Sequence, residues 1–385
     1  MFNLILNKSN LTIHIIAFLI MITPLVGAIL GTQYQFVLIS LSIIYLLYDY
    51  IKRKGRLHYL MYIPFILLMV MFVYSLSTFS TKIIYHTANS IFYFIAAYWL
   101  FKQDKIFLQK MSFVTLVIFY IYFLGAGLYY GFTPWNINHY FVGGSKNYVS
   151  AMAIFLQIFY SISYYRSKRK LPMVTVVITL VICVITAGRS GIGLSAMIVL
   201  FSSYFMLFHG NRTIKISIFI TALLVFIMVF VNLDTINEIL ILNTNLNQGM
   251  ESSRFLANQS YFDNLSIGNL ILGIDFSTLS VYQEIDMEVN PHNTYILAHS
   301  RFGLAYLFFI LFFILSSLYI FIFYKNTLVY IIFLIIYSVR IYFDVLITNE
   351  MILYFIFLSL LEVSKTSRLR AIFRVILKLN KEIKI

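Results

Sequence analysis

Apolar residues come in twelve long runs along the chain, and short polar stretches separate these runs. The runs lie near residues 11–31, 34–51, 57–77, 84–101, 107–130, 147–165, 171–187, 190–209, 214–233, 302–323, 327–345 and 348–363. A run of about 20 apolar residues crosses the hydrocarbon core of a bilayer as an α-helix, and a helix satisfies its own backbone hydrogen bonds. The pattern predicts an all-α polytopic membrane protein with about twelve transmembrane helices.

The composition agrees with this prediction. Of the 385 residues, 61% are hydrophobic and 11% are charged, whereas soluble domains are roughly 45–50% apolar and roughly 25% charged. A soluble globular enzyme and a disordered chain are therefore excluded. The single cysteine, Cys183, also excludes an intramolecular disulfide and a cysteine-based zinc site.

Lys and Arg residues gather in every second connection between the runs. All but six of the 28 lie near the chain ends or beside the second, fourth, sixth, eighth and tenth connections. Cytoplasmic connections of membrane proteins are enriched in Lys and Arg, so we expect the even-numbered connections and both termini in the cytoplasm. This asymmetry accounts for the net charge of +14, and no nucleic-acid partner is implied.

One connection on the predicted outer side is much longer than the others. It runs from about residue 234 to 301, between the ninth and tenth runs, and it is rich in aromatic and aliphatic residues. Loops of this length are usually functional or disordered, and the apolar content predicts a folded unit against the membrane surface. We expect one integral membrane domain over residues 1–367 that includes this loop. Residues 368–385 form a basic amphipathic cytoplasmic tail that is typical of a helix on anionic lipid.

Six basic residues break the charge pattern, and some of them are candidates for binding an anion. They are Lys82, Lys146, Arg189, Arg254, Arg301 and Arg340. Arg189 lies among small residues between two apolar runs, where a charge is costly unless it has an anionic partner. Arg254 near the start of the outer loop is the second candidate. Arg340 precedes Asp344 by four residues, so an ion pair within one helix is the simpler explanation there.

Two histidines near the tenth run are candidates for acid–base chemistry. Pro291 favours a helix start with Asn290 as its N-cap, and a helix from there places His292 and His299 on one face, with Arg301 roughly opposite. An unperturbed imidazole titrates near pH 6.5 and is able to accept a proton. A lone histidine at the membrane interface is often only a hydrogen-bonded structural residue. His292 is the stronger candidate of the two, because it stands next to Asn293 and under the long outer loop. The neighbouring Asn293 and Tyr295 are further possible site residues.

No cofactor is expected. The chain has no Walker A, Rossmann glycine or HExxH motif, and its histidines are too scattered for a metal cluster. Asp286 and Glu288 are the one pair of acids suited to a divalent cation, and acids in an aqueous loop are more often only solvated. We therefore predict no metal site.

The order of these motifs resembles a known family. Gly188-Arg-Ser-Gly191 lies between two apolar runs, and Ser253-Arg254 begins the long outer loop. Asn269-Leu-Ile-Leu-Gly273 follows, and Pro291-His-Asn-Thr-Tyr295 then leads into an apolar run with Gly303. Over about residues 185–320 this order resembles the C-terminal signature of the O-antigen ligase/polymerase superfamily, which includes the Wzy-type polymerases and the WaaL-type ligases. Asp275 and Tyr306 stand where that family often has a second glycine.

The resemblance implies a GT-C-like, metal-independent, inverting glycosyltransferase in the bacterial cytoplasmic (inner) membrane, with its active site facing the periplasm or exterior. The donor would be an undecaprenyl-diphosphate-linked oligosaccharide. The acceptor would be a second lipid-linked repeat unit in a polymerase of O-antigen or capsular polysaccharide, or the lipid A core in a ligase. Arg189 and Arg254 would hold the diphosphate, and His292 would deprotonate the acceptor hydroxyl.

Partners and alternative functions follow from the same comparison. A chain-length regulator, a flippase and membrane lipid would be the partners of such a polymerase. A lipid-linked oligosaccharide flippase is the alternative of a different class, but it would carry charges along a central cavity, whereas the unusual charges here lie near the outer ends of the runs. A non-catalytic membrane scaffold is the last alternative.

Overall fold

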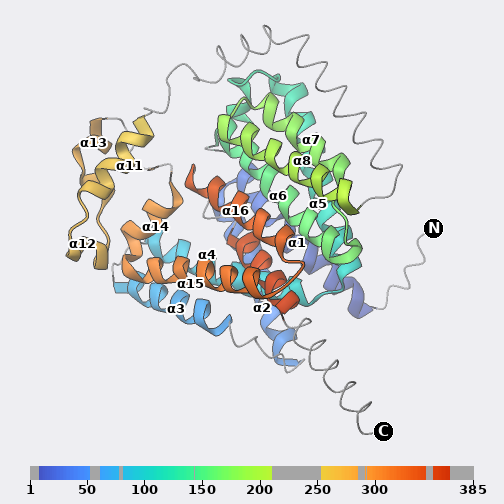
Figure 1. Ribbon diagram of the computed structural model, residues 1–385, viewed down its shortest axis with the longest axis horizontal. Helices are drawn as coiled ribbons and strands as arrows, with labels where there is room; N and C mark the ends of the chain where they lie inside the picture. The colour runs from blue at the N-terminus through green and yellow to red at the C-terminus, as the bar shows by residue number, and fades with distance from the viewer. Residues whose placement is uncertain are drawn as a thin grey trace.

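The computed structural model describes residues 8–52, 61–77, 81–142, 144–209, 253–284, 291, 293–343 and 350–364. Within these ranges every regular element is a helix (Figure 1). The expectation of an all-α protein is therefore confirmed for the described part of the chain. The ninth predicted run and the basic tail lie outside it.

The described helices coincide with the other predicted runs to within a few residues. The N-terminal part contains α1 (Lys8–Leu30), α2 (Thr32–Lys52), α3 (Tyr62–Ser77), α4 (Thr81–Lys102), α5 (Lys105–Tyr130), α6 (Lys146–Lys168), α7 (Met173–Ile185) and α8 (Arg189–His209). The C-terminal part contains α15 (Leu304–Phe323), α16 (Leu328–Tyr342) and a last helix over residues 350–364.

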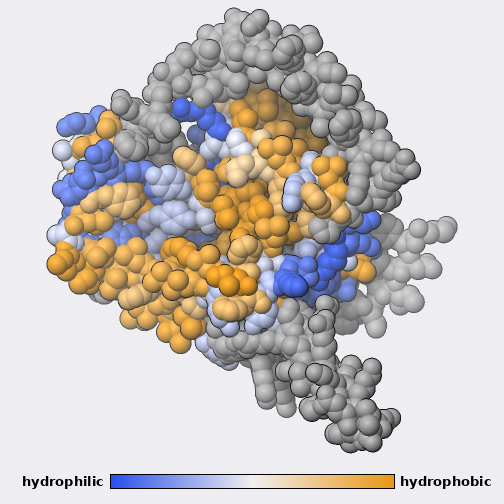
Figure 2. All heavy atoms as spheres, in the orientation of Figure 1, coloured by the Kyte–Doolittle hydropathy of each residue, from blue (hydrophilic) through white to orange (hydrophobic). Residues whose placement is uncertain are grey.

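Several of these helices are suited to a membrane. Leu11–Leu30, Lys105–Tyr130, Arg189–Phe208 and Leu304–Phe323 are both long enough and apolar enough to cross a bilayer. Further apolar helices in the described ranges have 10–17 residues. Figure 2 shows apolar side chains over α15 and α16, and hydrophilic side chains on the part of the molecule that lies to the left. The chain is thus a multi-pass membrane protein, and the number of twelve spans stays a prediction.

The helix ends that were predicted to be cytoplasmic lie together. Glu362 in the last helix places its Oε1 2.7 Å from Nζ of Lys105 on α5 and its Oε2 3.2 Å from Nε of Arg166 on α6. The Arg166 guanidinium also lies over the ring of Phe101 on α4, 4.1 Å from its centroid. Tyr165 packs its ring against aromatic rings of α8 and α16. The buried Arg166 therefore joins helix ends that the charge pattern had assigned to one side.

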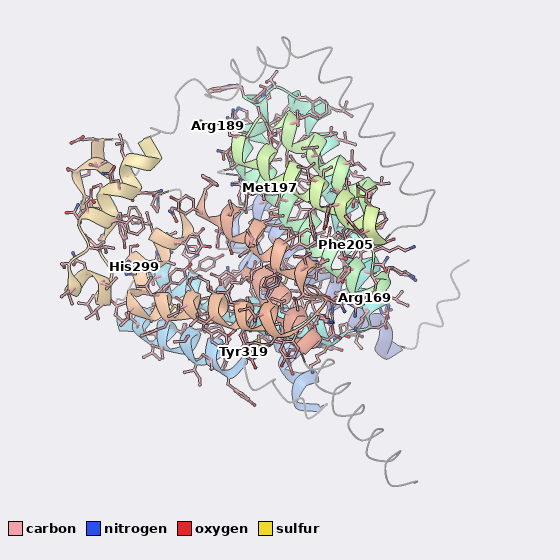
Figure 3. The ribbon with its side chains drawn as sticks, viewed as in Figure 1. Arg169, Arg189, Met197, Phe205, His299 and Tyr319 are labelled. Atoms are coloured by element: carbon pink, nitrogen blue, oxygen red, sulfur yellow. The ribbon has the colours of Figure 1, made fainter. Side chains whose placement is uncertain are left out.

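The opposite helix ends also meet. The Val142 N–H donates to the carbonyl oxygen of Ala28 at 2.9 Å, which joins the loop after α5 to the end of α1. The Tyr85 hydroxyl of α4 donates to the carbonyl oxygen of Thr32 at the start of α2, at 2.8 Å. Figure 3 shows Arg169 and Phe205 towards one end of the bundle and Arg189 towards the other. The alternation of the two ends agrees with the charge pattern, and the assignment of this second end to the outside stays a prediction.

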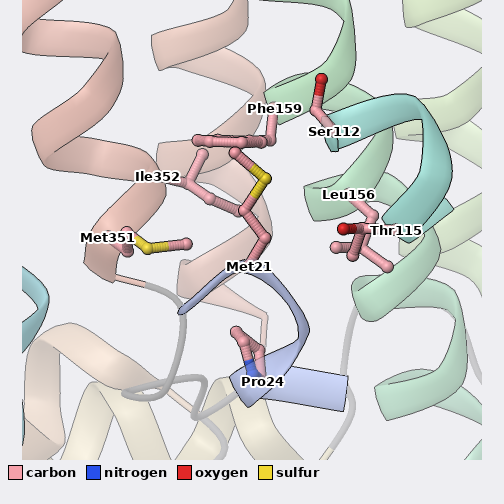
Figure 4. Close-up of a pocket in the computed structure, with 8 residues that line it drawn as sticks. All are labelled: Met21, Pro24, Ser112, Thr115, Leu156, Phe159, Met351 and Ile352. Carbon is pink, nitrogen blue, oxygen red and sulfur yellow. The ribbon is translucent and has the colours of Figure 1, made fainter. Parts of the chain in front are cut away.

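A small cavity lies inside the bundle, between α1, α5, α6 and the last helix (Figure 4). Its lining is mostly apolar and carries no charged side chain: Met21, Pro24, Ser112, Thr115, Leu156, Phe159, Met351 and Ile352. Pro24 lies inside α1 and has no N–H to donate to the preceding turn. A cavity with this lining is not suited to a charged ligand.

The long connection that was predicted to lie outside contains a folded unit, which we call the outer unit after that prediction. It comprises α11 (Ser253–Asp263), α12 (Ile267–Leu272), the 3-10 helix η4 (Phe276–Thr278) and α13 (Ser280–Glu284), packed on α14 (Thr294–Phe302). Its small core is formed by Ala257, Tyr261, Phe276, Tyr282, Ile296 and Leu297. The expectation that the loop is folded is confirmed for these residues, and in Figure 1 the outer unit lies beside the ends of α14 and α15.

Two glycines allow the outer unit to pack closely against α14 and α15. Gly273 follows α12 with a φ of 88°, and Gly303 separates α14 from α15 with a φ of 50°. A Cβ at Gly273 would lie within 3.0 Å of the carbonyl oxygens of His299 and Ser300, and one at Gly303 would lie within 3.0 Å of the Ile271 backbone. Both positions thus combine a left-handed backbone with a close backbone crossing, which only glycine accommodates.

Replacing Gly303 by alanine is therefore expected to detach the outer unit. The added Cβ meets backbone atoms that have no room to move, so we expect a lower melting temperature in detergent and faster proteolysis between residues 253 and 302. Gly193→Ala is the matched control, because a Cβ there meets nothing within 4 Å and alanine favours the helix interior by about 1 kcal/mol. A normal protease pattern for Gly303→Ala would contradict the crossing.

Candidate functional site

The centre of the candidate site is Arg340, near the C-terminal end of α16. Its side chain is 0% exposed. The guanidinium Nη2 donates to the Asn147 carbonyl oxygen at 2.6 Å and to Ser150 Oγ at 3.4 Å, and Nη1 donates to Ser190 Oγ at 3.3 Å. Arg340 thereby ties α16 to the first turns of α6 and α8. Asp344, the ion-pair partner predicted for Arg340, lies outside the described residues.

Arg189 is the first residue of α8 and is exposed. The tight turn before it is built by Ala187, which has a φ of 52°, and by Gly188, where a Cβ would approach Asn147 Oδ1 to 2.8 Å. Gly191 similarly packs against Ser150, 2.8 Å from where its Cβ would lie. Small residues in this turn therefore bring the α8 N-terminus against the start of α6, and leave the Arg189 side chain on the surface.

The start of α14 differs from the prediction. The helix begins at Thr294, and its N-cap is Asn293, whose Oδ1 accepts from the N–H groups of Tyr295 at 2.9 Å and Ile296 at 3.3 Å. An Asn side chain is among the best N-caps, and it is closer to the apolar stretch than Asn290. The predicted helix start at Pro291, with Asn290 as its N-cap, is therefore wrong. His292 lies outside the described residues, so the helical face that it was predicted to share with His299 stays a prediction.

The loop candidates converge on the same end of α16. The Tyr295 hydroxyl donates to the Ser338 carbonyl oxygen at 3.2 Å. From α11, Asn258 Nδ2 donates to the Tyr342 hydroxyl at 3.4 Å. Ser338 and Tyr342 flank Arg340 on α16, so Tyr295 and the outer unit reach the helix turn that carries the buried guanidinium.

Two more contacts extend this arrangement to the predicted arginine of the outer unit. Asn293 Nδ2 donates to Asn258 Oδ1 at 3.5 Å, which links the α14 cap to α11. Arg254 lies on α11 one turn before Asn258, and its side chain is outside the described residues. The structure therefore brings α11, Asn293 and Tyr295 to the Arg340 region, whereas the roles given to His292 and Arg254 stay predictions.

His299 has a structural role in this arrangement. Its Nδ1 lies 2.7 Å from the Tyr261 hydroxyl of α11, and its Nε2 lies 3.1 Å from the Leu270 carbonyl oxygen of α12. The side chain is buried, and Figure 3 shows it at the outer-unit end of α14. Because both ring nitrogens are engaged within the outer unit, His299 holds α11 and α12 on α14.

The local charge favours an anion. Lys146 begins α6 next to Asn147, and Arg189 begins α8 next to Ser190, so both flank groups that bind Arg340. Burial lowers the pKa of Lys146 below its ordinary value. The N-termini of α6 and α8 add positive helix dipoles at the same place. Three cationic residues and two helix N-termini therefore meet at this end of the bundle, an arrangement suited to a phosphate group.

Sequence reasoning gave Lys146 no role and overlooked Glu350. Lys146 appeared only as an exception to the charge pattern. Glu350 begins the described part of the last helix, where it accepts a hydrogen bond from the Tyr354 hydroxyl at 3.3 Å. Ser90 on α4 is a second hydrogen-bond partner. An acid at the edge of an apolar run is the signal that identifies such a residue.

Arg301 is half-buried on α14. Burial lowers its pKa to about 10, so its guanidinium stays charged at neutral pH. Among the described residues no group of three or more His, Cys, Asp or Glu side chains is arranged to hold a metal ion. Asp286 and Glu288 lie outside these residues, so the expectation that no metal is needed stays a prediction.

Comparison with known proteins gives no family for this chain. It matches no protein-family model, no curated protein and no solved structure.

Proposed function

We propose that the chain is a metal-independent, inverting glycosyltransferase that polymerises undecaprenyl-diphosphate-linked oligosaccharide repeat units on the outer face of the cytoplasmic membrane. The observation that carries the proposal is the cationic end of α6, α8 and α16. There Arg189 is exposed on the α8 N-terminus, directly beside the turn that binds the buried Arg340. The motif residues Asn293 and Tyr295 lie at the same end.

The chemistry of the transfer explains why cations belong there. The acceptor hydroxyl oxygen attacks the anomeric carbon of the donor sugar from the face opposite the diphosphate. The bond from that carbon to the diphosphate oxygen breaks, and its electron pair leaves with the diphosphate. The leaving group gains negative charge in this step, and preorganised donors that stabilise such charge are often the largest contribution to catalysis.

Each residue has a role in this mechanism. Arg189 holds the diphosphate through the planar, bidentate donors of its guanidinium, and Arg254 approaches it from the outer unit. Arg340 fixes the starts of α6 and α8, so that their N–H groups and Arg189 face the diphosphate. The acceptor hydroxyl proton passes to the His292 imidazole. The lipid tail of the donor lies along the membrane helices.

A ligase shares the donor half of this mechanism, and a flippase moves the same lipid without breaking a bond. The cavity inside the bundle is small and apolar (Figure 4), and the cationic residues discussed above lie at the helix ends. This arrangement supports surface chemistry on a lipid diphosphate over passage of a charged glycan through the bundle.

The test is a reconstitution. Purified protein in vesicles is given lipid-linked repeat units alone, in EDTA, and the products are separated by length. We expect a ladder of glycans. A single transfer that requires lipid A core would indicate a ligase, movement of the lipid with no new glycosidic bond would indicate a flippase, and activity that needs added Mg²⁺ would instead implicate Asp286 and Glu288.

A separate prediction concerns the side of the membrane on which each connection lies. A reporter fused after Asn264 is expected to be active only outside the cytoplasm, and one fused after Arg169 only inside. The reason is the basic alternation of the connections together with the grouping of helix ends at Glu362 and at Arg340. Residue 264 in the cytoplasm would place the cationic site on the wrong side for a lipid-linked donor.

A further inference from the structure

The short helix α12 presents its apolar side chains outward. Ile267 is 81% exposed and Leu272 is 63% exposed, and Leu270 and Ile271 are exposed as well. Its polar residue turns back instead: Asn269 Nδ2 donates to the Asn264 carbonyl oxygen at 3.1 Å. A helix that faces water shows the opposite arrangement, with polar residues outside. The outward face of α12 is therefore suited to an apolar environment.

The close backbone contacts at Gly273 and Gly303 fix the position of this apolar face along the axis of α15. Gly273 ends α12 against the last turn of α14, and Gly303 begins α15 against the backbone of Ile271. On α15, Phe308 and Leu311 are exposed apolar residues of a helix suited to span the membrane. At 1.5 Å per residue, Phe308 lies only about 7–8 Å along the axis from Gly303. The apolar surface of α15 thus continues onto α12, which Figure 1 shows beside that end of α15.

The charges around α12 show whether it would contact a membrane by electrostatic attraction to lipid headgroups or by burial of apolar side chains. Residues 264–274 contain no charged side chain, and Asp263 and Asp275 border them on both sides. Acidic borders give no attraction to anionic lipid, whereas burial of apolar side chains in the acyl-chain boundary needs no charge. Contact through α12 is therefore hydrophobic.

We propose that α12 inserts its apolar face into the outer leaflet of the bilayer and anchors the outer unit there. The four side chains that enter the lipid are those of Ile267, Leu270, Ile271 and Leu272. Bilayer lipid is the occupant because the face is continuous with the exposed surface of α15. The anchor holds α11 and α14 at a fixed height over the outer end of α16. This inference rests on the predicted topology and not on the glycosyltransferase activity.

Site-directed spin labelling of the full chain in vesicles of neutral phosphatidylcholine tests the anchor. Cys183 is replaced by alanine, and a nitroxide is attached at Ile267→Cys or, as the matched control, at Glu284→Cys. Glu284 is an exposed residue of the same outer unit, on α13. Collisions are measured with oxygen, which concentrates in lipid, and with a water-soluble nickel chelate. We expect oxygen to dominate at position 267 and the nickel chelate to dominate at position 284, with no change when anionic lipid or salt is added.

The other outcomes would overturn the proposal. Equal nickel accessibility at positions 267 and 284 would place α12 in water. Protection of position 267 from both reagents that fades as the protein is diluted in lipid would identify a second copy of the chain as the occupant. Oxygen accessibility that appears only after a polyprenyl diphosphate is added would identify the donor tail, and a requirement for anionic lipid would refute hydrophobic insertion. None of these readings depends on enzymatic activity.

Discussion

Replacing Arg189 by lysine is expected to reduce polymerisation by about 10²–10³-fold, the usual loss when one donor to a developing anion is removed. Lysine keeps the charge but loses the planar fork that binds two phosphate oxygens. Because Arg189 is exposed at the start of α8, we expect the thermal stability to stay unchanged. The measurement is the rate of ladder formation on membranes with equal amounts of each variant.

Arg340→Lys separates positioning from binding. Arg340 is buried and holds Asn147, Ser150 and Ser190 of two other helices. A lysine cannot reach all of them, and each lost hydrogen bond to a charged group costs about 1.5–3 kcal/mol. We expect both activity and the melting temperature to fall, in contrast to Arg189→Lys.

The single cysteine is a built-in probe for comparing the thermal unfolding of the Arg189→Lys and Arg340→Lys variants. Cys183 is buried beside Gly191, so a thiol-reactive dye labels it only as the bundle opens and the labelling rate reports thermal unfolding. Wild-type ladders from Arg189→Lys would refute the diphosphate role. An unchanged melting curve for Arg340→Lys would refute the positioning role.

Replacing His292 by alanine is expected to have the second large effect. A general base contributes about 10²–10⁴-fold to the rate, so turnover should fall by that amount. Binding of the lipid-linked donor should persist, because the imidazole acts on the acceptor proton and not on the diphosphate. The measurements are ladder formation and the binding of a labelled donor to the same membranes.

His299→Ala and Arg301→Lys are the controls for this prediction. His299 bonds to Tyr261 and to the Leu270 carbonyl oxygen, so His299→Ala should loosen the outer unit and expose it to protease. Arg301→Lys keeps a cation on α14 and should be mild. Full activity of His292→Ala beside an inactive but stably folded His299→Ala would transfer the catalytic role to His299.

Much of the fold follows from the sequence because hydrophobic runs and charge are local signals. The predicted run near 302–323 has one means of satisfying its backbone in lipid, which is a helix, and α15 covers all but its first two residues. The separation of Lys105 and Arg166 from Arg189 and Arg340 likewise predicts two ends of a bundle. The glycines at positions 273 and 303 and the small residues around Arg189 are visible in the sequence, although their partners are not.

The tertiary structure decided how these parts combine. The N-cap of α14 is Asn293 and not Asn290. Either asparagine could cap a helix, and the packing of the helix decides at which residue it begins. His299 became a link in the outer unit once Tyr261 and Leu270 were brought to its two ring nitrogens. Arg340, which the sequence paired with a neighbour four residues away, holds groups 150 or more positions distant in the chain. The sequence by itself determined the helices and their charged ends, since both arise from local chemistry, whereas contacts between segments far apart in the chain exist only after the helices have packed.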